Sequence, residues 1–301
     1  MSETITKVAV AGATGNLGPA IVEQLVSAGF AVTALTRKGG ARTFPAGVSA
    51  VEVDYDSVDS LVAALQGQDA VVSTLNDAFV PAQLKLIEAA SQAGVKRYIP
   101  SEFGCDTLNP KTAALPVFSG GKIVVQKALR EKAEAGSLSY TLVVNGPFLD
   151  WGLMVGFLID VKNKQAKLYD GGDRVFSATT LADIGKAVAG VLRKLAETKN
   201  RAVYVQSAAT TLKALVAAGK KASGQPEAWT ETVVPVDDLQ AEAFAELKKE
   251  KPDPAIFAVK FIQVGIFGEG YGAHFEKLDN ELLGIKELSA SELDALVARY
   301  A

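Results

Sequence analysis

Three glycines stand at regular intervals directly after an apolar run near the start of the chain: Gly12, Gly15 and Gly18. A glycine backbone can turn tightly and approach a phosphate closely, and a helix N-terminus attracts negative charge. We therefore expect this loop to bind the pyrophosphate of a dinucleotide, with Gly18 allowing close packing of helix on strand. The alternative is an ordinary strand-turn-helix with incidental glycines. The predicted contacts are Gly12, Thr14, Gly15, Asn16, Leu17 and Gly18.

Two basic residues, Arg37 and Lys38, follow the next apolar run at residues 31–36. Sites that prefer NAD place Asp or Glu at the end of this strand to bind the ribose 2′-hydroxyl, whereas Arg accommodates a 2′-phosphate. No acidic residue ends this run, and the planar fork of a guanidinium suits a phosphate. The pair therefore predicts NADPH rather than NADH as the cofactor. The alternative is that both residues are solvated loop charges.

Polar and aromatic residues follow three later strand-like runs, at Asn76, at residues 101–106 and at residues 145–148. A parallel sheet gathers the carboxyl ends of its strands at one edge, and ligands of doubly wound folds bind there. We therefore expect these residues to complete the cofactor site. The predicted contacts are Asn76, Ser101, Phe103, Asn145, Pro147 and Phe148.

A lysine without its usual tyrosine partner follows the fifth strand-like run. Short-chain reductases use a Tyr-xxx-Lys pair, in which the lysine lowers the pKa of the tyrosine and contacts the nicotinamide ribose. No such pair exists in this chain, since Glu102 follows Tyr98 at the fourth position. Phe118 instead lies four residues before Lys122. The lysine position is retained and the phenolic acid is absent.

Alternating strands and helices must position these residues. Apolar spacing predicts a parallel, doubly wound α/β sheet with right-handed crossovers, that is, a Rossmann fold. We expect an NADP-binding domain at residues 1–150 and a smaller, mostly helical substrate lobe at residues 151–301, with residues 175–207 returning to the Rossmann core. The predicted strands are residues 8–11, 31–36, 50–53, 69–75, 96–100 and 140–144, and the predicted helices are 20–26, 58–66, 81–94 and 123–135.

The second half of the chain has a different pattern. Residues 167–176 resemble a hairpin or a turn between short strands, because Asp170-Gly171-Gly172 interrupts an apolar run. A further strand is expected at residues 202–205. The predicted helices are residues 181–195, 210–222, 237–250, 255–267 and 290–300.

Composition excludes several classes of function. A formal net charge of −3 over 301 residues gives no basic face for nucleic acid or an anionic membrane. No apolar run approaches the ~20 residues of a membrane span, and the N-terminus lacks the apolar core of a secretory signal. A single cysteine, Cys105, and a single histidine, His274, argue against a disulfide and against a histidine-rich metal site. We expect a cytoplasmic protein without a metal.

Several motifs together resemble the isoflavone reductase-like group, which belongs to the NmrA-like atypical short-chain reductases and includes phenylcoumaran benzylic ether and pinoresinol-lariciresinol reductases. The motifs are Gly-Ala-Thr-Gly-Asn-Leu-Gly at 12–18, Pro-Ser-Glu-Phe-Gly at 100–104, Lys122, and Asn-Gly-Pro-Phe at 145–148. Residues 146–152 and 267–272 resemble its fungal branch. The resemblance implies an NADPH-dependent oxidoreductase in which Lys122 is the catalytic residue and replaces the Tyr-Lys pair. An amine can exchange protons near neutral pH only if its pKa falls from ~10.4.

The resemblance also implies an apolar or aromatic small-molecule substrate, which accepts a hydride at an electrophilic carbon. Gly120 and Gly121 form a looser helix start than bulkier residues would, so Lys122 could be held less rigidly. The alternative function is a dinucleotide-binding redox sensor without turnover, and the chain could be a monomer or a homodimer. The expected pocket walls, each equally compatible with a core position, are Phe103, Phe148, Trp151, Met154, Phe157, Phe267 and Tyr271.

Overall fold

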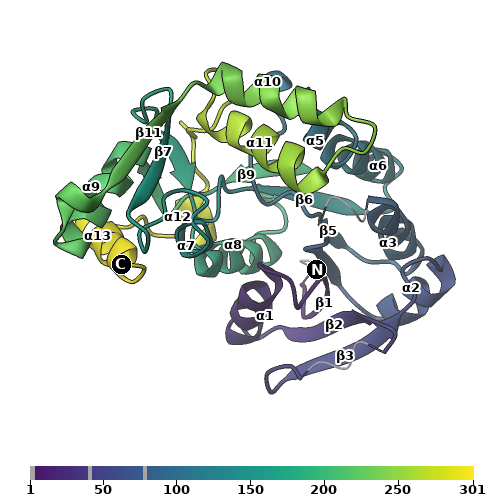
Figure 1. Ribbon diagram of the computed structural model, residues 1–301. Helices are drawn as coiled ribbons and strands as arrows, with labels where there is room; N and C mark the ends of the chain where they lie inside the picture. Colours follow the sequence, from purple (N-terminus) through teal and green to yellow (C-terminus); the bar gives the residue numbers. More distant parts are fainter. Residues whose placement is uncertain (1–3, 40–42, 77–79) are drawn as a thin grey trace.

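A seven-stranded sheet, in which every neighbouring pair is parallel, forms the centre of the computed structural model (Figure 1), which describes residues 4–39, 43–76 and 80–301. The strand order reverses beside β1, which pairs with β2 on one side and β4 on the other. Ligands of doubly wound sheets bind at such a reversal. In spatial order the strands are β3 (Val48–Val53), β2 (Ala31–Arg37), β1 (Lys7–Ala11), β4 (Ala70–Ser73), β5 (Arg97–Ile99), β6 (Ser139–Val144) and β9 (Arg201–Tyr204).

Helices cover both faces of this sheet. Side chains alternate along a strand, so Val8 and Val10 of β1 pack on one face and Ala9 and Ala11 on the other. The valine face carries α1 (Gly18–Ser27) and α8 (Leu181–Arg193), and the alanine face carries α2 (Val58–Leu65), α3 (Val80–Gln92) and α6 (Lys122–Glu134). The doubly wound α/β fold predicted from the sequence is therefore confirmed.

Two of these helices begin at side-chain caps. Ser57 accepts a hydrogen bond from the backbone N–H of Ser60 at the start of α2. Thr180 accepts one from the backbone N–H of Asp183 at the start of α8. Such caps satisfy backbone donors that have no partner within the helix.

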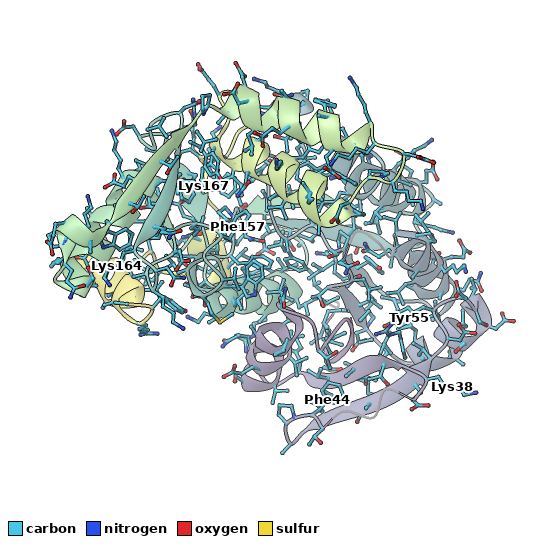
Figure 2. The ribbon with its side chains drawn as sticks, viewed as in Figure 1. Lys38, Phe44, Tyr55, Phe157, Lys164 and Lys167 are labelled. Carbon is cyan, nitrogen blue, oxygen red and sulfur yellow. The ribbon has the colours of Figure 1, made fainter. Side chains whose placement is uncertain are left out.

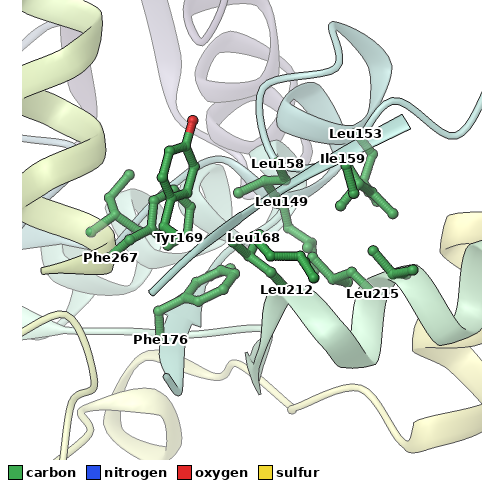
Figure 3. Packing of buried hydrophobic residues seen from close by; sticks show 14 of the residues in the cluster. Leu149, Leu153, Leu158, Ile159, Leu168, Tyr169, Phe176, Leu212, Leu215 and Phe267 are labelled. Carbon is green, nitrogen blue, oxygen red and sulfur yellow. The ribbon is translucent and has the colours of Figure 1, made fainter. Parts of the chain in front are cut away.

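A second hydrophobic core joins the elements of the C-terminal half. Figure 3 shows part of it, in which Leu168, Leu212 and Phe176 pack together. Besides α8 and β9, the elements of this half are α7 (Leu149–Met154), β7 (Gln165–Tyr169), β8 (Phe176–Ala178), β10 (Ala208–Thr210), α9 (Leu212–Ser223), η2 (Pro226–Ala228), β11 (Thr230–Val234), α10 (Val236–Leu247), α11 (Pro254–Phe267), α12 (Asn280–Leu283) and α13 (Ala290–Ala298). Of these, α12 packs in the core of the main sheet through Leu283. Two short helices, α4 (Pro110–Ala113) and α5 (Pro116–Ser119), precede α6.

The strands on either side of Asp170-Gly171-Gly172 exist, but they do not pair with each other as a hairpin would. β7 pairs in parallel with β11, and β8 pairs antiparallel with β10. The hairpin interpretation is wrong, and the alternative of a turn between two short strands agrees with the structure. Each strand has its partner more than 25 residues further along the chain, which local turn residues cannot predict. β11 itself lies in a segment for which the sequence predicted no element.

β9 joins the main sheet beside β6, and the helix that precedes it, α8, packs on the same sheet. The domain division at residue 150 stays a prediction. Over residues 4–39, 43–76 and 80–301, no helix combines the length and the apolar character that crossing a membrane requires.

Candidate functional site

The glycine loop connects β1 to α1 in a tightly packed turn. Gly12 adopts a φ of +80°, and its carbonyl accepts a 3.0 Å hydrogen bond from the backbone N–H of Gly15. A Cβ on Gly12 would lie 2.6 Å from Oγ1 of Thr74, and a Cβ on Gly18 would lie 2.5 Å from the carbonyl carbon of Ala13. Both positions therefore require glycine for steric reasons.

The N-terminus of α1 has the character of an anion site. Its N-cap residue, Leu17, makes no side-chain cap hydrogen bond, and its first turn contains no acidic residue. Gly15 is exposed, and a Cβ there would meet nothing closer than the Gly12 carbonyl at 3.4 Å. The backbone donors at this helix start thus face a position that a phosphate oxygen can approach.

A cavity of about 670 Å³ runs from this loop along the carboxyl ends of the strands. It brings together residues from the loop after β1, from β2, from the segments after β4 and β5, and from α6. The predicted site residues in its walls are Gly12, Thr14, Gly15, Asn16, Leu17, Arg37, Asn76, Ser101, Phe103, Lys122 and Phe148.

Other walls of the cavity come from residues that sequence reasoning did not select. Tyr55 follows β3, so the strand-end rule applied to that strand would have found it. Ile262 lies on α11 and no local signal connects it to the glycine loop. The additional wall residues are Ala13, Leu35, Thr36, Tyr55, Thr74, Leu75, Glu102 and Ile262.

Four predicted cofactor contacts lie outside the walls of this cavity. Gly18 is buried at the start of α1, and Lys38 is exposed just after the end of β2 (Figure 2). Asn145 and Pro147 are buried in the segment after β6, where they contact Thr179, the residue that follows β8. The Thr179 hydroxyl donates to the Asn145 carbonyl at 2.6 Å, and the Thr179 N–H donates to the Pro147 carbonyl at 3.1 Å.

Five predicted substrate-pocket residues also lie outside these walls. Trp151 contacts the Phe148 ring edge to face, with 6.3 Å between the ring centroids. Met154 is 60% exposed at the end of α7, and Phe157 packs against the second core (Figure 2). The other two, Phe267 and Tyr271, are buried in the second core.

Phe267 shows why an aromatic side chain at helical spacing does not by itself indicate a pocket. Its ring stacks on Tyr169 with 4.7 Å between centroids and meets Phe176 edge to face at 5.4 Å (Figure 3). Phe267 is only 2% exposed, so its side chain is enclosed within the second core. Phe267 thus lies in the core and outside the walls of the cavity that contains the glycine loop.

Lys122 is the first residue of α6 and reaches into the cavity. Its ammonium donates a hydrogen bond to the backbone carbonyl of Glu102 and lies 5.4 Å from the centroid of the Phe118 ring. A Cβ on Gly104 would lie 3.4 Å from the Lys122 nitrogen, so the glycine in Pro-Ser-Glu-Phe-Gly leaves room for the ammonium. Phe118, which occupies the sequence position of the absent tyrosine, is buried next to the Lys122 ammonium.

Neighbouring titratable groups are held in their neutral forms. Burial raises the pKa of the Cys105 thiol to about 11, although the charge of Lys122 acts in the opposite direction. Burial also raises the pKa of Tyr55, whose hydroxyl donates to the Leu35 carbonyl at 3.2 Å. Neither the thiol nor the phenol therefore ionises near neutral pH.

No group of three or more His, Cys, Asp or Glu side chains in the described part of the chain could hold a metal ion. The residues of the cavity walls instead supply backbone donors, one guanidinium, one ammonium, hydroxyl and amide side chains, and aromatic or aliphatic side chains, together with one acidic residue, Glu102, whose side chain is buried. This set of groups suits a phosphorylated cofactor and an apolar partner.

Comparison with known proteins identifies the family. The model of the NmrA-like family matches residues 4–244. The oxidoreductase poxI of Penicillium oxalicum is 33% identical over 97% of this chain and 93% of its own length. Pinoresinol reductase 2 of Arabidopsis thaliana is 31% identical over 67% of this chain and 68% of its own length.

A solved structure has the same fold at lower identity. The binary complex of leucoanthocyanidin reductase with NADPH from Vitis vinifera superimposes with a TM-score of 0.77, at 19% identity, and the match covers 98% of this chain and 99% of that one. The motifs at residues 12–18 and 100–104 thus indicated the correct relatives. The chain belongs to the NmrA-like family and resembles the isoflavone reductase-like reductases within it.

Proposed function

We propose that the protein is an NADPH-dependent reductase that transfers a hydride to an aromatic or conjugated small molecule. The observation that carries this proposal is the single cavity that joins the glycine loop, Arg37 and Lys122. The names of the relatives support it, since poxI is called an oxidoreductase and the Arabidopsis protein a pinoresinol reductase.

The residues present fit NADPH. The turn at Gly12 and Gly15 and the uncapped start of α1 supply backbone donors for the pyrophosphate. Arg37, exposed at the end of β2, supplies a guanidinium for the 2′-phosphate. Tyr55 lies in the same cavity and adds an aromatic face to this end of the site.

Bound NADPH supplies a hydride from its nicotinamide ring, and the protein must orient the acceptor and move a proton. Phe103 and Phe148 line the cavity with Lys122 and provide apolar surface for a planar acceptor. An ammonium has three N–H donors. Within the described residues, the Glu102 carbonyl takes one of those of Lys122, and the others can hold a ribose hydroxyl and protonate a carbonyl or phenolic oxygen.

The proposal is tested by incubating the protein with NADPH and a panel of aromatic ketones, enones, quinones and benzylic ethers. Oxidation of NADPH, followed at its near-ultraviolet absorbance band, supports the reductase when product formation matches the NADPH consumed. Tight NADPH binding without turnover across the whole panel would instead favour a dinucleotide-binding redox sensor.

Arg37 provides a prediction about cofactor choice. We expect Arg37→Ala to weaken NADPH binding by about 10- to 100-fold, because a hydrogen bond to a charged group contributes about 1.5–3 kcal/mol. Binding of NADH should stay unchanged, since it has no 2′-phosphate. Fluorescence titration with both cofactors measures the two affinities. Arg130→Ala, which removes an exposed guanidinium from α6, is the matched control. An equal loss of NADPH and NADH affinity in Arg37→Ala would contradict the assignment.

A further inference from the structure

The residues just before α6 do little to fix the direction of the Lys122 side chain. Gly121 is the N-cap residue and makes no side-chain cap hydrogen bond. Another glycine, Gly120, precedes it, and a Cβ there would meet nothing within 4 Å. A lysine side chain also has four flexible carbon atoms. The direction of its ammonium must therefore be set by contacts from elsewhere in the fold.

Glu102 contacts α6 at two points. Its backbone carbonyl accepts the hydrogen bond from Lys122, and its carboxylate accepts one from the side-chain amide of Gln126 at 3.2 Å. Gln126 lies four residues after Lys122, one turn further along the same helix face. One residue of the Pro-Ser-Glu-Phe-Gly segment is thus fixed to both the first and the second turn of α6.

Thr107 completes a closed network with these two side chains. Its hydroxyl donates to the other carboxylate oxygen of Glu102 and accepts a 2.7 Å hydrogen bond from the amide of Gln126. Glu102, Thr107 and Gln126 are each only 1–2% exposed. A polar network that is buried and internally hydrogen-bonded is rigid, because loosening any bond leaves a polar group without water.

We propose that Glu102, held by Thr107 and Gln126, is a positioning residue for Lys122. The network fixes the 102 peptide, whose carbonyl then directs the ammonium into the cavity. This inference rests on the proposed function for its effect on turnover, because it assumes that Lys122 exchanges a proton with the substrate. Its effect on the reactivity of Lys122 can be measured without any substrate.

The test compares Thr107→Val, which removes the hydroxyl at nearly constant volume, with Thr107→Ser, which keeps it. Trace acetylation with acetic anhydride at constant pH, read by peptide mass spectrometry, reports how freely each lysine amine reacts. We expect Thr107→Val to raise acetylation of Lys122 by about tenfold relative to the exposed Lys127, the factor that corresponds to about 1.4 kcal/mol. Thr107→Ser should retain the wild-type value.

Two further variants keep the outcome interpretable. Thr198→Val removes an equally buried hydroxyl from the Arg97 hydrogen-bond cluster, which begins at the opposite end of β5, and should leave Lys122 unchanged. Gln126→Met tests the same network if Thr107→Val does not fold. Unchanged acetylation of Lys122 in folded Thr107→Val or Gln126→Met would overturn the positioning role.

Kinetics separates this proposal from the proposed function. With a substrate from the panel, Thr107→Val should lower kcat by about 10-fold or more, because small displacements of a catalytic group are costly, while the NADPH dissociation constant should change much less than kcat. Thr107→Ser should restore kcat. If no panel compound oxidises NADPH, the proposed function fails while the acetylation result still decides the positioning role.

Discussion

Lys122→Ala is expected to lower kcat by about 10²- to 10⁴-fold, the usual contribution of a positioned general acid or base. The amine is half-buried in the cavity and bound to the Glu102 carbonyl, and the nearby thiol of Cys105 cannot replace it, since burial raises its pKa to about 11. NADPH affinity should fall much less, because the glycine loop and Arg37 remain. Stopped-flow absorbance and fluorescence titration measure the two quantities separately.

Variants of the same helix make this result specific. Lys127→Ala removes an exposed ammonium from α6 and should leave kcat unchanged. Lys122→Arg retains a positive charge but cannot release a proton near neutral pH. If Lys122 only binds the ribose, Lys122→Arg will retain most of the activity. If Lys122 transfers a proton, Lys122→Arg will be nearly as inactive as Lys122→Ala. Wild-type turnover in Lys122→Ala would refute either role.

The sequence predicted the parts of this site that depend on local chemistry. The glycine loop could be predicted because only glycine tolerates the turn at Gly12. The parallel strands could be predicted because apolar runs are typical of strands that are buried on both faces. The rule that residues at the end of the second strand meet the ribose selected Arg37, and the structure places Arg37 in the wall of the same cavity as the glycine loop. Each of these inferences needs only neighbouring residues.

The remaining parts depend on contacts that no local pattern specifies. Ile262 reaches the cavity from α11, far along the chain from the glycine loop. Glu102 and Thr107 hold Gln126 through side chains whose direction is set by the folded backbone. Phe267 is an aromatic residue at helical spacing, as a residue that lines a pocket would be, yet neighbouring rings enclose it in the core. Apolar spacing indicates burial but does not distinguish a core from a pocket.

Gly18→Ala is expected to have the second large effect, on both the fold and the cofactor. A methyl group there would contact the Gly12 carbonyl and lie 2.5 Å from the Ala13 carbonyl carbon. These are backbone atoms of the phosphate-binding turn, so the turn must move. We expect the free energy of unfolding to fall by about 1–3 kcal/mol, as in other overpacked sites. NADPH affinity should fall on the order of 100-fold.

Gly15→Ala separates the two effects, because its added methyl group would have only an ordinary 3.4 Å contact with the Gly12 carbonyl. Gly15 is exposed on the cavity wall, so this methyl would occupy space that a phosphate needs. We therefore expect weaker NADPH binding with an unchanged urea unfolding curve. Gly120→Ala, with open space around the new methyl, is the control for stability. If Gly15→Ala binds NADPH as tightly as the wild type, the pyrophosphate does not lie against this turn, and the cavity would need a different ligand orientation.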